Sequence, residues 1–262
     1  MNWTDLNLIP AMPEIVLLTA LCAVLLVDLW LKDNSRAITH YLWLPDEKRG
    51  ITAGLAILGV LAAAVFQVAL WPGEPVETFN AMFVLDGMSY VAKLAVYAVV
   101  LVLFVVSRGY LKARQIYKGE FYSLTMFALL GMCVMVSANH FLTLYIGLEL
   151  LSLSLYALIA LRREDTRASE AALKYFVLGA LASGLLLYGI SMIYGATGSL
   201  LLPEVLMAGL GQSANPWLLK LGLVFVVVAV AFKLGAVPFH MWVPDVYHGS
   251  STAVTALVGT AP

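Results

Sequence analysis

Two ionisable residues stand inside long apolar stretches of this 262-residue sequence. Glu149 lies in the run from Phe141 to Leu161, and Lys233 lies in the run from Trp217 to Val237. A charge held at the centre of a lipid bilayer costs about 2.5–3.5 kcal/mol on insertion scales, so such residues usually serve a function. A buried carboxylate and a buried amine can pass protons, but they can also form an ion pair that only fastens two helices together.

Glu149 has polar neighbours at helical spacing. Tyr145, Glu149, Ser152 and Tyr156 follow the pattern i, i+4, i+7, i+11, which places them on one face of a helix. Such a stripe should face protein or water rather than lipid, and a short carboxylate side chain cannot reach the bilayer surface from this depth. We therefore predict that Glu149 belongs to a proton relay, with a structural ion pair as the alternative.

Lys233 stands just before a predicted interruption of its helix. Pro238 follows by five residues, and proline removes a backbone donor and clashes with the preceding turn. Interrupted backbone is tolerated at membrane depth only where it is buried or lines a cavity. Burial disfavours an ammonium group and a nearby carboxylate favours it, so a lysine with a switchable partner can load and release a proton. The alternative for Lys233 is snorkelling towards the nearer membrane surface.

Two histidines follow Pro238. His240 and His248 lack the i, i+4 spacing of a zinc-binding helix, so we predict no metal site. Histidine titrates near neutral pH, which suits a group on a proton route. We interpret His240 either as part of such a route or as a structural histidine.

Other charged residues lie nearer the ends of their apolar runs. Lys174 follows Glu170 by four residues, in the order that favours a local ion pair, so this pair or snorkelling could account for it without a functional role. Asp86 and Lys93 are seven residues apart and share a helix face, which predicts a structural pair.

The elements that carry these residues are predicted to be transmembrane helices. Hydrophobic residues make up 62% of the chain and charged residues 12%, against about 45–50% and about 25% in soluble domains. An all-α, polytopic membrane bundle follows, because apolar runs of about 20 residues span a bilayer. An eighth apolar stretch begins near Ser251, and the sequence ends at Pro262. The predicted spans are residues 13–31, 51–70, 84–107, 120–138, 141–161, 169–194 and 217–237.

Loop charges alternate along the chain and predict its orientation. The first, third and fifth loops are basic, whereas residues 71–83 and 196–217 contain no lysine or arginine. The positive-inside rule then places the basic loops in the cytoplasm and the N-terminus outside. The basic residues are Lys32, Arg36, Lys48 and Arg49 in the first loop, Arg108, Lys112, Arg114 and Lys118 in the third, and Arg162, Arg163 and Arg167 in the fifth.

Several function classes are not indicated by the sequence. The net charge of -1 gives no basic surface for nucleic acid. Cys22 and Cys133 are too few to ligate an iron–sulfur cluster, and no glycine-rich nucleotide-binding motif occurs. We therefore expect no cofactor in this chain.

Three segments carry a resemblance to a known family. Residues 139–153, residues 168–175 and, most specifically, residues 232–247 resemble the antiporter-like membrane subunits of bacterial NADH:quinone oxidoreductase, respiratory complex I. The first two segments favour the subunit N branch. The group also includes the multisubunit cation/proton antiporters. The resemblance runs from about Asp86 to Pro262, and the first 80 residues match only in hydropathy.

The resemblance implies a fold of two inverted helical repeats, each with one discontinuous helix. It implies functional residues at Glu149 on the fifth span, Lys174 on the sixth and Lys233 on the broken seventh, whereas Lys93 is outside the pattern. Family members have a second repeat that this sequence lacks. We expect N-terminal transmembrane helices in residues 1–110 and the first antiporter-like repeat in residues 111–262, which ends within or before the eighth helix.

The resemblance also implies a function and a setting. The chain is expected to translocate protons in the bacterial inner membrane through Glu149, Lys174, Lys233 and His240, beside other membrane subunits of complex I. Flavin, iron–sulfur clusters and quinone would be handled by other subunits. The alternatives are a subunit of a cation/proton antiporter and a purely structural membrane module.

Overall fold

The computed structural model describes residues 7–38, 46–71, 73–114, 116–211 and 215–261. Within these ranges, seven helices are long and apolar enough to cross a membrane, which confirms the polytopic α-helical bundle. In chain order the elements are η2 (Ile9–Ala11), α1 (Met12–Ile38), α2 (Asp46–Ala69), β1 (Val76–Thr78), β2 (Phe83–Leu85), α3 (Gly87–Ala113), α4 (Gly119–Val136), α5 (Phe141–Ile159), α6 (Thr166–Thr197), α7 (Leu202–Leu210), α8 (Pro216–Lys233), α9 (Val243–Gly249) and α10 (Thr252–Val258).

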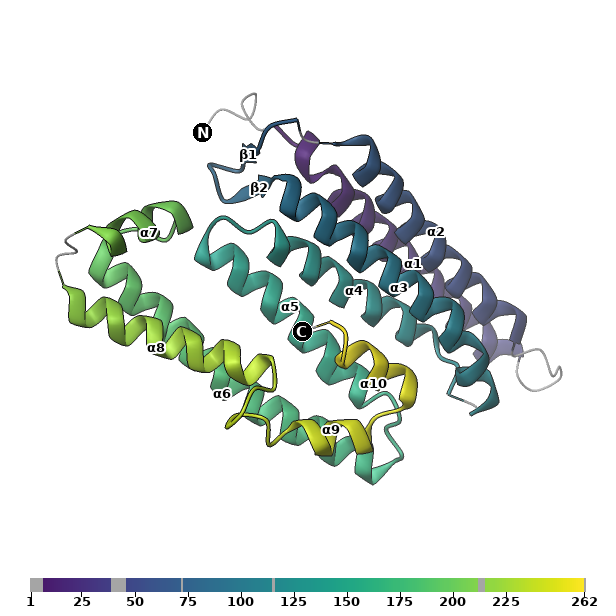
Figure 1. The fold of residues 1–262 in the computed structure, drawn as a ribbon. Helices are drawn as coiled ribbons and strands as arrows, with labels where there is room; N and C mark the ends of the chain where they lie inside the picture. Colours follow the sequence, from purple (N-terminus) through teal and green to yellow (C-terminus); the bar gives the residue numbers. More distant parts are fainter. Residues whose placement is uncertain (1–6, 39–45, 72, 115, 212–214, 262) are drawn as a thin grey trace.

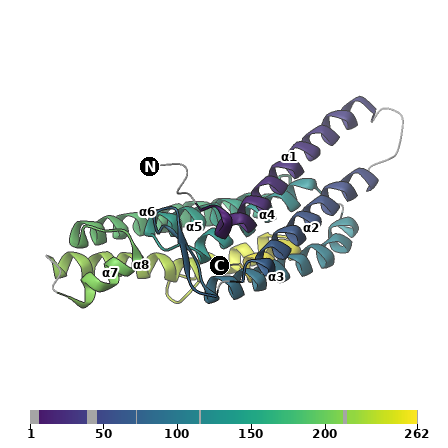
Figure 2. The same ribbon diagram turned by 90° about the horizontal axis from the view of Figure 1, so that it is seen from above.

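The long helices lie side by side, with α1–α3 on one flank, α4 and α5 in the middle, and α6 and α8 on the other flank (Figures 1 and 2). Close packing of the inner pairs depends on glycine. A Cβ atom on Gly131 of α4 would lie 2.7 Å from the carbonyl oxygen of Gly147 of α5, and one on Gly222 of α8 would lie 2.8 Å from that of Gly189 of α6. Small residues let helix backbones approach in a membrane, where no water drives helices together.

Polar side chains fix where several helices begin. Asp86 caps α3 by accepting a hydrogen bond from the backbone of Ser89, and Asp165 caps α6 by accepting one from Arg167. His140 caps α5 through Nδ1, and Asn215 caps α8. Each cap satisfies a first-turn amide that has no partner within its helix.

The third predicted span needs correction at its N-terminal end. Asp86 precedes the helix as its cap and does not interrupt the span. The predicted pair of Asp86 with Lys93 is wrong, because Lys93 forms an ion pair with Glu14 of α1 at 2.5 Å. Spacing along one helix could not reveal a carboxylate on another helix.

The interruption of the seventh span is confirmed. α8 ends at Lys233, four residues before the predicted end, and the chain turns at Gly235, whose φ is +63°. A cis peptide bond joins Val237 to Pro238, and the short helix α9 follows. Glycine supplies the left-handed backbone at this turn, and the absence of a side chain there leaves room for Val243.

Loops at one end of the bundle are joined by backbone pairing. β1 and β2 form an antiparallel hairpin, and Phe83 of β2 pairs with Ala138 in the joint between α4 and α5. His140 in the same joint pairs with Leu201, which precedes α7. The hairpin and α7 were not predicted from the sequence, because both are short and lie outside the membrane-spanning runs.

The described basic loops share the opposite end. Lys118, between α3 and α4, donates from Nζ to the backbone oxygen of Leu161 after α5, at 3.0 Å. The charge alternation along the sequence therefore corresponds to a separation of charge between the two ends of the bundle. The side chains of Lys32, Arg36, Lys48 and Arg49 in the first loop lie outside the described part of the structure.

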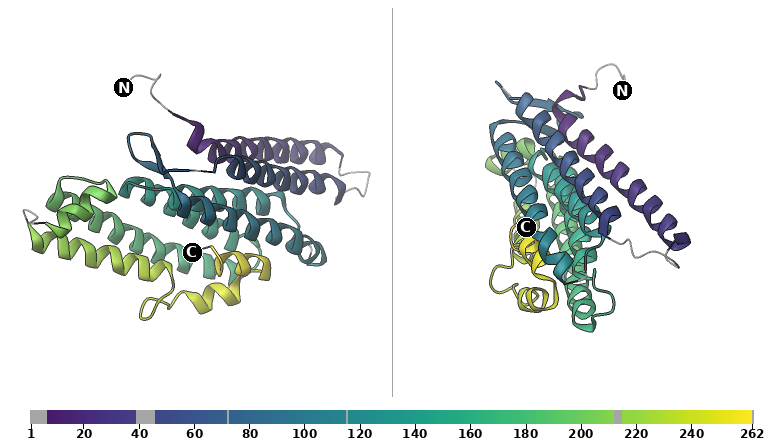
Figure 3. Two further views of the ribbon diagram at one scale, coloured as in Figure 1. Left: turned by 45° about the horizontal axis from the view of Figure 1, so that its top comes forward. Right: turned by 90° about the vertical axis from the view of Figure 1, so that its right-hand side faces the viewer.

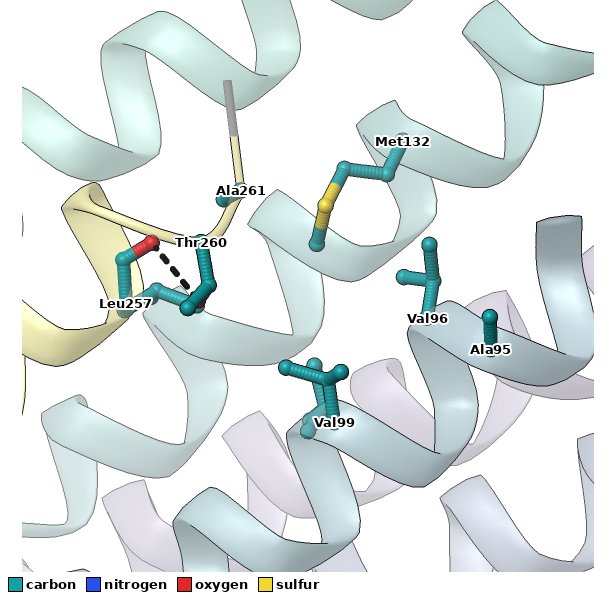
Figure 4. Close-up of a pocket in the computed structure, with 8 residues that line it drawn as sticks. Ala95, Val96, Val99, Met132, Leu257, Thr260 and Ala261 are labelled. Carbon is teal, nitrogen blue, oxygen red and sulfur yellow. Dashed lines mark hydrogen bonds between the residues drawn. The ribbon is translucent and has the colours of Figure 1, made fainter.

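The eighth apolar stretch forms α10, which has seven residues and is too short to span a bilayer. α9 lies beside the start of α6, whereas α10 packs against α3 and α5; both are the yellow segments of Figure 3. A pocket of about 200 Å³ is lined by residues of α3, α4 and α10 and by the segment after α10 (Figure 4). Its lining side chains are apolar except for Thr260, whose hydroxyl donates a hydrogen bond to the backbone oxygen of Ala256. The pocket therefore has no ionisable side chain that could bind a proton.

Candidate functional site

Glu149 and Lys233, from helices α5 and α8, meet inside the bundle. Lys233 Nζ lies 3.9 Å from Glu149 Oε1 and donates a hydrogen bond to Ser152 Oγ at 2.6 Å. Ser152 in turn donates to the backbone oxygen of Leu148. The polar stripe predicted on α5 is therefore the surface that receives the lysine.

The carboxylate has a hydroxyl partner of its own on a third helix. Ser183 of α6 donates a hydrogen bond to Glu149 Oε1. Tyr156, one turn below Ser152, presents its ring to Lys233 with 6.0 Å between Nζ and the ring centroid. Each member of the ion pair is thus held by a neutral hydroxyl, and their separation is longer than a hydrogen bond.

Burial makes this arrangement electrostatically significant. The side chain of Lys233 is 9% exposed and that of Glu149 is 22% exposed. Snorkelling of Lys233 to the membrane surface is therefore excluded, since its ammonium group points to Ser152 inside the bundle. Attraction between opposite charges is strong in a medium of low polarity, so small changes in their separation change the proton affinity of the pair.

The interrupted segment is held against the bundle by Trp242. Its Nε1 donates to the backbone oxygen of Phe232 at 2.9 Å, which satisfies a carbonyl near the end of α8. The indole ring stacks on Tyr175 of α6, with 4.4 Å between centroids. Lys233 is therefore the last residue of α8, and the non-helical backbone that follows it is anchored to the bundle by Trp242.

Lys174 lies apart from this pair, near the basic end of α6. Its Nζ lies 2.9 Å from Glu170 and 3.0 Å from Asp245 of α9, and its side chain is 45% exposed. The local pair with Glu170 is confirmed. The contact with Asp245 adds that Lys174 also ties the second half of the broken helix to α6.

His240 lies exposed in the turn between α8 and α9. Within the described residues its ring makes no hydrogen bond and no ion pair, so the structure does not join it to Glu149 or Lys233. The interpretation of His240 as a hydrogen-bonded structural histidine is not supported by this placement.

The charged and hydroxyl partners Ser183, Asp245 and Glu14 were not predicted from the sequence. Ser183 is a hydroxyl residue in the small-residue stretch of α6, and this hydroxyl is a signal that the sequence does show. Asp245 follows a proline in an irregular segment, where helical spacing gives no signal. Glu14 stands in the first turn of the first span, where carboxylates are common because the helix dipole favours them. None of the three could be paired from spacing alone, because each partner is on another helix.

A membrane-spanning helix bundle with one interrupted helix, and a buried lysine–glutamate pair beside the interruption, defines the antiporter-like class of membrane subunits. The model of the NADH:quinone oxidoreductase/Mrp antiporter transmembrane family matches residues 138–262 of this chain. This confirms the resemblance seen in the sequence.

Similar proteins extend the match over the whole chain. NADH-quinone oxidoreductase subunit N of Neisseria gonorrhoeae is 62% identical over 262 residues, which are 100% of this chain and 52% of that protein. The protein of the same name from Laribacter hongkongensis is 55% identical over 100% of this chain and 51% of its own length. The chain thus spans about half the length of the curated relatives it matches.

Solved structures agree on the fold. A chain of respiratory complex I from Thermus thermophilus with bound aureothin is 33% identical, with a TM-score of 0.67 over 92% of this chain and 52% of that one. A chain of the membrane-bound sulfane sulfur reductase, an archaeal respiratory membrane complex, has a TM-score of 0.73 at 23% identity, over 97% of this chain and 51% of that one. The second likeness speaks for the fold alone.

Proposed function

We propose that this chain serves in a proton-translocating membrane subunit of a bacterial NADH:quinone oxidoreductase. The observation that carries the proposal is the buried Glu149–Lys233 pair, with Lys233 Nζ 3.9 Å from the carboxylate and each group held by a serine hydroxyl. Buried ionisable residues of this kind are typical of proton pathways in membrane proteins. The names of the similar proteins support the assembly.

The chain itself would do no redox chemistry. Flavin, iron–sulfur clusters and quinone would belong to other subunits of the complex, and neighbouring membrane subunits would be the partners. Energy released by redox chemistry elsewhere would change the separation of Glu149 and Lys233. A shorter separation favours the protonated lysine, and a longer one favours release of its proton.

Lys174 and His240 would complete the route towards the basic end. Lys174 sits at that end with two carboxylate partners, and His240 lies in the turn between Lys233 and α9. The placement of described basic loops at one end supports an orientation with the N-terminus outside and those loops in the cytoplasm, in the bacterial inner membrane. The division into helices 1–110 and a repeat in 111–262 stays a prediction.

The test uses the full-length subunit in its assembled complex, reconstituted into vesicles. Glu149→Ala and Lys233→Ala should each lower proton pumping coupled to NADH oxidation while the complex still assembles. Matched controls are Glu204→Ala on α7 and Lys220→Ala on α8, which change exposed residues of the same types. Normal pumping by both Glu149→Ala and Lys233→Ala would contradict the proposal and would favour a purely structural module.

A second candidate, a subunit of a cation/proton antiporter, is favoured by the family description, which names both groups. Purification of the native assembly separates them. Flavin and iron–sulfur proteins that co-purify with the subunit, and NADH-driven pumping, support the oxidoreductase. Proton movement driven by a sodium gradient without NADH supports the antiporter.

A further inference from the structure

A second buried ion pair lies between α1 and α3, well separated in the chain from the site described above. Glu14 Oε1 and Lys93 Nζ are 2.5 Å apart. Lys93 is fully buried and Glu14 is 6% exposed. The family resemblance does not include Lys93, and the proposed proton route does not use either residue.

The hairpin β1–β2, which we call the outer hairpin, covers the Glu14–Lys93 pair. The ring of Phe83 in β2 covers Lys93, with 4.7 Å between Nζ and the ring centroid. Glu14 is in the first turn of α1, and Lys93 lies two turns into α3, so both are within roughly 10 Å of the helix starts along their axes. This places the pair just beneath the membrane surface opposite the basic loops.

Several polar atoms around the pair have no partner. Within the described residues, both oxygens of Glu14 and Lys93 Nζ make no hydrogen bond with acceptable geometry beyond their mutual contact, and the hydroxyl of Tyr97 makes none. Tyr97 lies one turn below Lys93, and its hydroxyl is next to the thiol of Cys133 on α4. Glu14, Lys93, Tyr97 and Cys133 thus form a buried polar cluster between α1, α3 and α4.

An ion pair that only fastens two helices together should have its remaining hydrogen-bonding groups satisfied, and the Glu14–Lys93 pair does not. A buried ion pair repays its desolvation only when hydrogen bonds fill the remaining capacity of both groups. Buried polar groups without protein partners usually bind internal water. Water, a carboxylate, an amine and a tyrosine hydroxyl in one cluster beneath the membrane surface can take up and hold a proton.

We propose that the Glu14–Lys93 cluster is a second proton-binding site, which holds internal water beneath the outer hairpin. In its resting form the pair is a carboxylate and an ammonium. A proton arriving from water at the outer surface adds to a carboxylate oxygen of Glu14, which gives a neutral acid beside the ammonium; the reverse step returns that proton to water. No bond other than this O–H bond forms or breaks, and no electron is transferred. The site does not depend on transport through Glu149 and Lys233.

Infrared difference spectroscopy tests the site independently of pumping. Spectra of the assembled complex, containing the full-length subunit, are compared between low and high pH in H₂O and D₂O. The wild type should show a protonated carboxyl band that shifts in D₂O, is lost in Glu14→Gln and is kept in Glu149→Gln. Tyr97→Phe should move this band, whereas the matched change Tyr90→Phe on the same helix should not. Identical spectra for the wild type and Glu14→Gln would overturn the proposal.

Two further measurements cover a failure of the single variant to assemble. The variant with both Glu14→Gln and Lys93→Met leaves no unpaired charge in the cluster, and it should assemble and lack the same band. A high-resolution structure of the wild-type complex should show ordered water bonded to Glu14 and Tyr97. A dry cluster, or a carboxyl band unchanged in the double variant, would identify a structural clip instead.

Discussion

Lys233 reaches Glu149 although the two residues stand at different distances from the starts of their helices. Glu149 lies roughly 12 Å along α5 and Lys233 roughly 26 Å along α8, at 1.5 Å per residue. Two features bring their charged groups within 3.9 Å. α8 begins farther out than α5 (Figure 1), and a helical side chain leans back towards its own N-terminus, which directs the long lysine to the level of the carboxylate.

This contact predicts coupling between the two residues. In the assembled complex, the double variant Glu149→Ala/Lys233→Ala should lose less pumping than the two single losses added together, because removal of one partner already leaves the other without its counter-charge. Residues in contact typically show interaction energies of about 0.5–3 kcal/mol in a double-mutant cycle. Proton-pumping rates of the four proteins give the measurement, and strictly additive losses would show that the two charges act independently.

Ser152 should matter more than its neighbour Ser154. Ser152→Ala removes the oxygen that accepts the hydrogen bond from Lys233, and a buried charged donor without a partner costs about 1–3 kcal/mol or more. Slower pumping at unchanged assembly is the expected result. Ser154→Ala is the control, since that serine is on the same helix and bonds only to the backbone oxygen of Leu150. Equal effects of the two changes would argue against a role for the hydroxyl of Ser152.

Asp245 should hold the second half of the broken helix against α6. Asp245→Asn removes the carboxylate charge that pairs with Lys174, so amide hydrogen exchange in residues 243–249 should become a few-fold faster. Glu170→Gln is the matched control, because that carboxylate pairs with Lys174 from the same helix and does not link it to α9. Hydrogen exchange followed by mass spectrometry reports both variants, and unchanged exchange in Asp245→Asn would remove this role.

Packing between α6 and α8 should be intolerant of a methyl group at Gly222. The new Cβ atom would lie 2.8 Å from the backbone oxygen of Gly189 and 3.1 Å from the backbone nitrogen of Ile193, so Gly222→Ala must push the helices apart. Overpacking of this kind costs about 1–3 kcal/mol. Gly184→Ala, on an open face of α6, should be neutral or slightly stabilising. Thermal unfolding of the purified complex distinguishes the two, and equal midpoints would contradict the packing argument.

Reporter fusions test the orientation. Fusions near Lys48, Lys112 and Arg163 should report the cytoplasm, and one near Glu77 should report the outside, because the basic loops stay on the cytoplasmic side. A fusion near Ser213, a residue outside the described part of the structure, should also report the outside. One reversed site among these would show that a span is missing or miscounted.

Much of the fold was predictable because the bilayer imposes a simple rule on sequence. Backbone groups in lipid must be paired within the element, so long apolar runs have to be helices, and the starts and ends of seven spans follow from hydropathy with errors of up to six residues. Pro238 predicted the interruption, but the turn starts earlier, at Gly235, whose backbone is left-handed. Tertiary packing of Val243 against Gly235 accompanies this turn, and hydropathy does not reveal such packing. The strands β1 and β2 have only three residues each, which is too short for an alternation of apolar and polar residues to be recognised in the sequence.

The sequence alone determined which charged residues stand within or near the ends of apolar runs, namely Glu149, Lys174, Lys233 and Lys93, since a charge in an apolar run is visible without any structure. Only the tertiary structure decided their partners. It paired Lys233 with Glu149 and Ser152, gave Lys174 the distant Asp245, and moved Lys93 from Asp86 to Glu14. Helical spacing fixes the face on which a side chain stands, but the lateral order and the depth offset of the helices decide which faces meet.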